Sequence, residues 1–425
     1  MAEAASSMDT RIGESLNERF SQTREFTRQL CAPLATEDCV IQSMPDASPT
    51  RWHLAHTTWF FETFILAAVP GYQPFDPAFE YLFNSYYNAV GEQFPRPSRG
   101  LLSRPRLEEI WAYRRHVDRQ MRELLSGSDD RQARRVTELG IHHEQQHQEL
   151  ILTDIKHALS CNPLFPVYQD APGSPVSTRR PATWLEFDEG IYAIGHEGHG
   201  FAFDNESPRH RQLVNDFEIS DRLVNCGDFL EFMDDDGYRR PEFWLCAGWQ
   251  TVREEGWQAP LYWHYRDDRW WQFTLAGLRP VEPAEPLCHV SFFEADAFAR
   301  WAGARLPTEV EWEIACQDAP VEGNFADTLL ATGVALHPAC PNEDAAGAPQ
   351  MFADVWQWTA SPYTAYPGYT PPQGALGEYN GKFMCNQYIL RGGSCATSKS
   401  HIRRTYRNFF PPETRWQFSG MRLAR

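Results

Sequence analysis

The first 160 residues contain four segments in which apolar residues recur at helical spacing, and this pattern constrains the fold most. The segments cover residues 11–30, 48–69, 106–127 and 129–159. Four amphipathic helices of this length are typical of a four-helix bundle. Ser48 is the expected N-cap of the second helix, with Pro49 in its first turn.

The sequence pattern changes after residue 160. Residues 161–183 contain five prolines and are expected to form a surface linker. Beyond them come short strand-like runs, turns, most of the tryptophans and one clear short helix at 294–304. The expected fold class is α+β in two domains, with a bundle at 1–160, a linker at 161–183 and a loop-rich domain at 184–425.

Composition excludes several classes of partner. The net charge of −18 disfavours binding to nucleic acid or to an anionic membrane. The N-terminus lacks the apolar core of a signal peptide, and no run of 18 apolar residues could span a membrane. The ten cysteines are scattered without a C-x-x-C pair, as expected for a reduced, cytoplasmic protein.

A histidine-rich string, HHEQQHQE at residues 142–149, lies inside the fourth helical segment. His143 and His147 are four residues apart, so both project from one helix face and could share a metal ion. The string also matches H-E-x-x-H, the signature of zinc proteases. The extended protease form would need Gly at position 150 and His at 153, where this chain has Leu150 and Thr153. A plain polar helix face is the remaining alternative.

The best candidate for a third ligand lies in the second helical segment, because bundles build metal sites from facing helices. WHLAHTTWFFE contains His53 and His56. His56 is flanked by apolar and aromatic residues and is expected in the core, whereas His53 is expected at the surface or outside the ligand set. Three neutral imidazoles with open positions suit Fe(II), Zn or another borderline metal.

Several strings together resemble one known family. Leu54-Ala55-His56 and His143-x-x-x-His147-x-Glu149 resemble the DinB-like bundle of the ergothioneine-biosynthesis sulfoxide synthases. The second half is similar to their formylglycine-generating-enzyme-like (C-type-lectin-like) domain, in the strings ARLPTEVEWE (304–313), DVWQWTASPY (354–363), RGGS (391–394) and FSGMRLAR (418–425). The resemblance covers nearly the whole chain, with both domains in the family's order.

The resemblance implies an enzyme that uses non-haem Fe(II) and O2. The family joins a thiol sulfur to C2 of the imidazole of hercynine, Nα-trimethylhistidine, and oxidises that sulfur to a sulfoxide. By motif position, the iron ligands are His56, His143 and His147. Three protein ligands leave octahedral positions for a thiolate, an imidazole nitrogen and O2.

Further site residues follow from the same resemblance. Gln146 corresponds to a glutamine that contacts the substrate imidazole. Arg96 and Arg99 correspond to two arginines that bind the carboxylate of the thiol, a suitable task for a bidentate guanidinium. Without the resemblance, both would be interpreted as ordinary surface arginines.

The string Asn408-Phe409-Phe410 matches a segment that contacts hercynine. An aromatic ring there can face the trimethylammonium group, and Asn408 can bond the carboxylate. The actinobacterial branch has Asn-Trp-Asp at this place, and its Asp helps to recognise γ-glutamyl-cysteine. Phe410 replaces that Asp here, which favours free cysteine as the sulfur donor.

The catalytic tyrosine of the actinobacterial branch has no secure match in the second half of this chain. Tyr86 and Tyr87 instead resemble a tyrosine pair in a branch that uses cysteine. A phenol near the metal can deliver a proton and favour C–S bonding over thiol dioxygenation. Aromatic packing is the alternative role for either ring.

Related functions remain as alternatives. An ovothiol-type 5-histidylcysteine sulfoxide synthase usually carries an additional methyltransferase, and a selenium-inserting homologue shares the scaffold. A formylglycine-generating enzyme would need a cysteine pair near the C-terminus, and Cys395 is the last cysteine. Two further alternatives are a Zn-dependent thiol transferase of the DinB type and a lectin-like binding module with a Zn-binding bundle.

Overall fold

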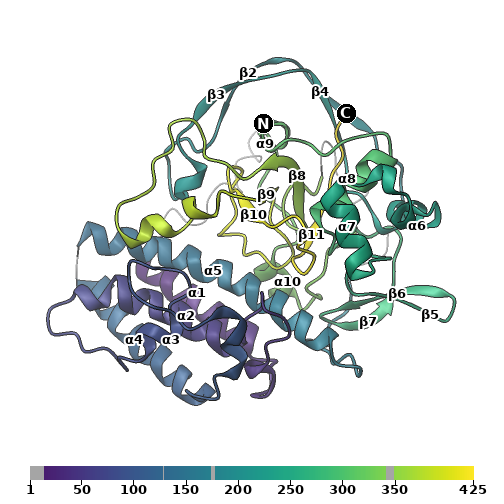
Figure 1. Ribbon diagram of the computed structural model, residues 1–425. Coiled ribbons are helices and arrows are strands. Elements are labelled where there is room, and N and C mark those ends of the chain that lie inside the picture. The colour runs from purple at the N-terminus through teal and green to yellow at the C-terminus, as the bar shows by residue number, and fades with distance from the viewer. Residues whose placement is uncertain (1–13, 128, 174–177, 341–348) are drawn as a thin grey trace. The chain divides into compact units, whose positions relative to one another are not determined.

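The computed structural model describes residues 14–127, 129–173, 178–340 and 349–425. Its contacts divide the chain into two compact units, Met1–Ile151 and Leu152–Arg425. Figure 1 shows the helical first unit in purple and blue and the mixed second unit in teal to yellow. Within the described ranges, no helix is both long and apolar enough to cross a membrane.

The four predicted helices are α1 (Leu16–Cys31), α2 (Thr50–Phe64), α4 (Leu107–Gly127) and α5 (Arg131–Ser160). The first unit contains α1, α2, α4 and α5 as far as Ile151, and the rest of α5 belongs to the second unit. α1 begins with a capping box between Ser15 and Glu18. The expected cap at Ser48 is wrong. Pro49 occupies the N-cap position of α2, which leaves Ser48 outside the helix, where its hydroxyl accepts a hydrogen bond from Arg99.

α2 is the central helix of this unit, because every residue from Thr50 to Glu62 is buried. A helix that is buried all round must have neighbours on every side. It ends at Phe64, earlier than expected, and the 3₁₀ turn η2 (Leu66–Ala68) follows. The long connection to α4 contains a short helix, α3 (Phe79–Phe83), and the 3₁₀ helix η3 (Arg96–Leu101).

The second unit is built from small sheets. The largest has the order β10-β9-β8-β11, in which β11 is parallel to β8 and the other pairs are antiparallel. Its strands are β8 (Trp356–Pro362), β9 (Tyr388–Arg391), β10 (Asn408–Phe410) and β11 (Ser419–Gly420). The other sheets pair β1 (Trp184–Phe187) with β4 (Phe217–Ser220), β2 (Gly190–Ile194) with β3 (His210–Val214), and β5 (Trp263–Arg266) with β6 (Arg269–Thr274) and β7 (Gly277–Pro280).

Short helices connect these sheets. The predicted helix at 294–304 is α8 (Phe292–Trp301), which begins at a capping box between Ser291 and Glu294. The sequence interpretation missed the others, which are α6 (Cys226–Asp234), α7 (Cys246–Glu255), α9 (Glu309–Ala315) and α10 (Ala326–Thr332). The first unit contains one further 3₁₀ turn, η1 (Asp38–Val40), and the second contains η4 (Asp204–Glu206), η5 (Gly237–Arg239), η6 (Pro241–Phe243), η7 (Ala375–Glu378) and η8 (Gly381–Phe383).

Buried ion pairs and a hydrogen bond join sequence strings of the second unit. Arg407 bonds Glu309 at 2.9 Å, and Arg391 of the RGGS string bonds Glu313. The Trp312 indole donates to Gln357 at 3.0 Å, which joins α9 to β8. The three strings ARLPTEVEWE, DVWQWTASPY and RGGS are therefore parts of the core of this unit.

Candidate metal centre

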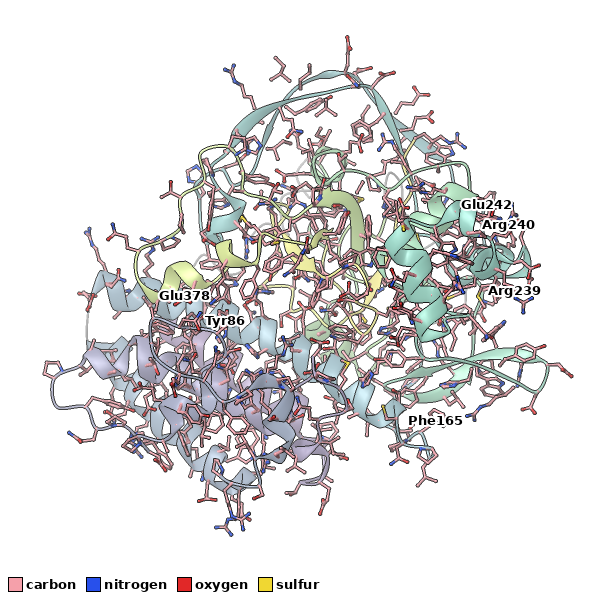
Figure 2. All side chains as sticks on the ribbon, viewed as in Figure 1. Tyr86, Phe165, Arg239, Arg240, Glu242 and Glu378 are labelled. Carbon is pink, nitrogen blue, oxygen red and sulfur yellow. The ribbon has the colours of Figure 1, made fainter. Side chains whose placement is uncertain are left out.

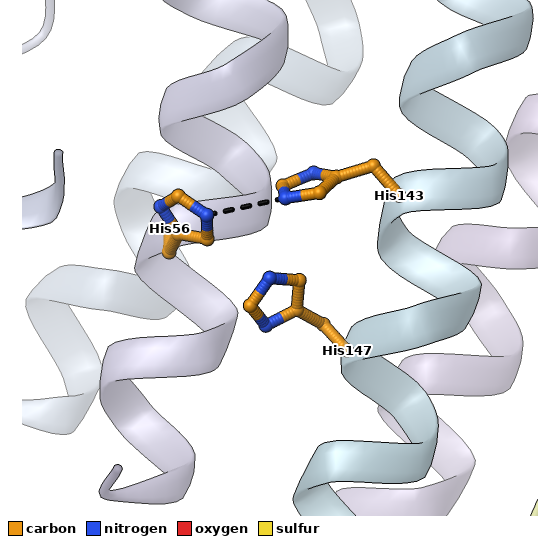
Figure 3. Close-up of side chains that lie close together, drawn as sticks. All are labelled: His56, His143 and His147. Atoms are coloured by element: carbon orange, nitrogen blue, oxygen red, sulfur yellow. Dashed lines mark hydrogen bonds between the residues drawn. The ribbon is translucent and has the colours of Figure 1, made fainter. Parts of the chain in front are cut away.

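Three histidines from two helices lie together in the core of the first unit. His56 of α2 faces His143 and His147 of α5 (Figure 3), and one nitrogen of each lies within 4.8 Å of the others. All three side chains are buried. The two Nε2 atoms of His56 and His143 are 3.2 Å apart. Two nitrogens bound at right angles to one metal ion, each at ~2.1 Å, would be about 3 Å apart, so the residues fit a metal ion.

Hydrogen bonds to the outer nitrogens orient two of the rings. His56 Nδ1 donates to the carbonyl of Phe83 at 2.6 Å, which leaves its Nε2 as the acceptor nitrogen. His53 Nδ1 lies 2.8 Å from His147 Nδ1. His53 is therefore buried rather than at the surface, and it supports a ligand candidate from behind, as partners of metal-binding histidines commonly do.

The electrostatic environment keeps the three imidazoles neutral. Burial lowers the pKa of His143 to about 3. Burial and the neighbouring His143 hold the pKa values of His56 and His147 well below the usual range. A neutral imidazole is the form that binds a metal, so near pH 7 the cluster is prepared for a cation.

Two indoles flank His56 along α2. Trp52 stacks on the His56 ring at 4.6 Å and 12°, and Trp59 stacks on it at 5.5 Å and 17°. Positions four before and three after a residue share its helix face, which brings the rings together. The Arg99 guanidinium covers Trp52, with 3.4 Å between Cζ and the ring centre. This stack fixes the plane of His56.

Glu144, the central acid of the H-E-x-x-H string, has a different task. Its carboxylate is fully buried and accepts from Arg24 at 2.8 Å, from Thr27 at 2.6 Å and from Arg114. Burial alone would raise the pKa of Glu144, but the two guanidinium groups outweigh it and lower the pKa to about 2. This carboxylate connects α1, α4 and α5 and is no general base for a protease.

The two arginines predicted as a pair have different surroundings. Arg99 is buried, and its guanidinium donates to Ser48 Oγ at 2.9 Å and to Ser85 Oγ at 3.3 Å. Arg96 is exposed and donates to the backbone carbonyl of Asp46. Arg99 therefore adjoins the histidine cluster through Trp52, whereas Arg96 lies at the surface of the unit.

Tyr86 and Tyr87 follow α3, and Figure 2 labels Tyr86. Their rings stack at 4.6 Å; Tyr87 is buried and Tyr86 is half-buried. Tyr87 also packs 5.7 Å from Trp59. The Asn84 side chain bonds both the N–H and the carbonyl of Tyr87, at 3.1 and 3.0 Å. Tyr87 thus contacts Trp59, which in turn stacks on His56.

The other predicted site residues lie on α5 and β10. Gln146 is half-buried on α5, next to His147. Asn408, Phe409 and Phe410 form β10 of the second unit and are half-buried. Phe409 stacks on Tyr363 at 4.0 Å and 9°.

Sequence reasoning missed several residues that shape the centre. Trp52 and Trp59 could have been found from their spacing around His56 in WHLAHTTW. Asn84, Arg24 and Arg114 gave no such signal, because their partners are distant in the sequence or bonded through the backbone.

Comparisons with known proteins agree with this arrangement. Residues 19–151 match the DinB superfamily, and residues 176–425 match the sulfatase-modifying factor enzyme 1-like domain. The hercynine oxygenase of Mycobacterium tuberculosis is 32% identical over 401 residues, which cover 89% of this chain and 91% of that protein.

Two further relatives show how far the similarity extends. The hercynine oxygenase of Mycolicibacterium smegmatis is 35% identical over 67% of this chain and 70% of its own length. The formylglycine-generating enzyme of Streptomyces coelicolor is 29% identical over 39% of this chain and 55% of that protein. With similarity to hercynine oxygenases across both units and three histidines placed for a metal, the chain belongs to the hercynine oxygenase family, iron-dependent oxidoreductases of ergothioneine biosynthesis.

Proposed function

We propose that this protein joins the sulfur of free cysteine to C2 of the hercynine imidazole and oxidises that sulfur to a sulfoxide. The reaction breaks the C2–H and S–H bonds and forms the C–S and S–O bonds. O2 accepts the four electrons, with one oxygen atom in the sulfoxide and the other in water. The cluster of His56, His143 and His147, kept neutral and within 4.8 Å, carries the proposal.

Fe(II), when bound by these histidines, supplies the O2 chemistry and a position for the thiolate. Side chains of the protein are proposed to bind the substrates. Arg99 presents a buried guanidinium next to the cluster, where it can bind the cysteine carboxylate. Arg96 is proposed to add a weaker, more exposed contact. Gln146, the neighbour of His147 on α5, is proposed to bond the hercynine imidazole.

The remaining contacts are assigned to the acceptor substrate and to proton transfer. Asn408, Phe409 and Phe410 are proposed to hold the carboxylate and trimethylammonium groups of hercynine. Phe410 offers no acidic group for the amine of γ-glutamyl-cysteine, which is why cysteine is the proposed donor. Tyr87 is the proposed proton donor because it packs against Trp59, which stacks on His56.

The direct test is aerobic incubation of the Fe(II)-loaded chain with hercynine and either cysteine or γ-glutamyl-cysteine, followed by product mass. We expect hercynylcysteine sulfoxide, with cysteine consumed in preference. Histidine in place of hercynine tests the ovothiol-type alternative. Lack of a sulfoxide with either thiol would refute the proposal, and preference for γ-glutamyl-cysteine would refute the role given to Phe410.

The tyrosine assignment has its own matched pair of variants. Tyr87→Phe should shift the product from sulfoxide toward cysteine sulfinate, because it removes the proton donor but keeps the ring. Tyr86→Phe is the control, since Tyr86 stacks on Tyr87, whereas Tyr87 packs on Trp59, the ring that stacks on His56. If both variants give the parent's product ratio, neither tyrosine delivers the proton.

A further inference from the structure

A pocket in the first unit is lined by two residues that contact His56. Its walls include Trp52, which stacks on His56, and Phe83, whose carbonyl accepts from Nδ1. None of the three clustered histidines lines it. The pocket is therefore separate from the space that the Nε2 atoms of His56 and His143 share.

Three arginines line this pocket: Arg51, Arg99 and Arg104. Arg51 is only 7% exposed, and its guanidinium has one long contact, 3.5 Å to the carbonyl of Pro105. Arg104 is exposed and donates to the carbonyl of Ser103 at 2.9 Å. In the part of the chain that the structure describes, no acidic side chain forms an ion pair with Arg51 or Arg104.

This lack of acidic partners is unusual for the composition of the chain, which has 57 acidic and only 39 basic residues. Most buried cations in this structure are paired, as Arg24 is with Asp118 and Arg407 with Glu309. Burial and the charge of Arg104 both lower the pKa of Arg51. A buried cation without a counter-charge is costly, and an anion from solution would relieve that cost.

We propose that Arg51 and Arg104 of this pocket bind a small oxyanion, either a carboxylate or a tetrahedral ion such as sulfate. The planar fork of a guanidinium matches two oxygens of such an ion. Arg51 lies in the first turn of α2, a helix of 15 residues, where the helix dipole also favours a negative charge. The site does not depend on the proposed function, because Arg51 and Arg104 have no part in it.

The test is calorimetric titration of the full chain with sulfate and, separately, with acetate, at constant ionic strength and without chloride. We expect saturable binding of one ion per chain. Arg104→Gln and Arg51→Gln should each weaken it at least tenfold. Arg104→Lys, which keeps the charge and loses the fork, should weaken it less than Arg104→Gln. Stronger binding of sulfate would identify a tetrahedral ligand, and stronger binding of acetate a carboxylate.

Arg106→Gln is the matched control, because Arg106 is a near neighbour in sequence, is exposed and already pairs with Glu109 at 3.3 Å. It should change the affinity less than twofold. If neither ion binds saturably, or if Arg104→Gln behaves like Arg106→Gln, the anion site does not exist. Arg104 is exposed, so its variants keep the test valid even if Arg51→Gln fails to fold.

Discussion

Two faces of the same helix, α5, bury titratable groups in opposite ways. On one face, His143 and His147 are kept neutral by burial and are directed at His56. On the other face, Glu144 is kept charged by Arg24 and Arg114. Neutral groups with lone pairs can receive a cation, whereas a compensated charge holds helices together. A string of five residues thus serves a metal centre and a structural ion pair.

The largest effect is expected from His143→Ala. Removing one of three donors should lower the bound iron to less than a tenth of the parent's, while the fold persists because the structural carboxylate is untouched. Metal analysis together with far-ultraviolet circular dichroism checks both statements. A folded variant with full iron content would show that His143 is no ligand.

Glu144→Gln should give the opposite result. Breaking a fully buried ion pair should lower the free energy of unfolding by about 3–5 kcal/mol, whereas the iron content per folded molecule stays near the parent's. Chemical denaturation and metal analysis measure the two quantities. The control is Glu138→Gln, which breaks a partly exposed pair with Arg19 and should cost only ~0–1 kcal/mol. An equal loss in both variants would remove the distinction between the two faces.

In the metal-free chain, the two faces of α5 should lose their contributions to the free energy of unfolding in different pH ranges. The pKa of His143 falls from 6.5 to about 3 on folding, so the unfolded chain binds the proton first and stability drops from about pH 6.5 downward. The pKa of Glu144 falls from 4.5 to about 2, so its contribution is lost only below about pH 4.5. His143→Ala should reduce the slope between pH 6.5 and 4.5, by at most about 1.4 kcal/mol per pH unit, and Glu144→Gln only below that window. Denaturation at several pH values measures both slopes.

The smallest effect is expected from Thr27→Val, which removes the hydroxyl that donates to Glu144 at 2.6 Å. Both arginines still compensate the carboxylate, so the loss should be about 1–2 kcal/mol without any change in metal content. Equilibrium denaturation checks the value. A loss as large as that of Glu144→Gln would mean that the hydroxyl, and not the guanidinium groups, stabilises the charge.

Sequence periodicity predicted the four long helices, and the rule that bundles build metal sites from facing helices predicted the upstream position of the third histidine. It could not predict the partners of Glu144, because Arg24 and Arg114 come from helices whose rotation about their axes is set only by packing. The same limit applies to Arg96 and Arg99, which are three residues apart in one motif, although one is exposed and the other buried. Spacing defines a face of one helix but not its register against another.

The second unit was harder to predict in detail. One of its helices, α8, was recognised, whereas α9 and α10 have seven residues each, about two turns. A pattern with a period of 3.6 residues has little room to appear in such a short segment. The capping box from Thr308 to Glu311 was the available signal for α9.

The stack of Trp52, His56 and Trp59 has an optical consequence. Indole fluorescence depends on what lies against the ring, and both indoles have their ring centres within 6 Å of the His56 ring centre. A transition-metal ion held by His56 would accept excitation energy from both. The indole fluorescence of the purified chain should therefore decrease as Fe(II) is added. Fluorescence would then measure metal loading without any substrate.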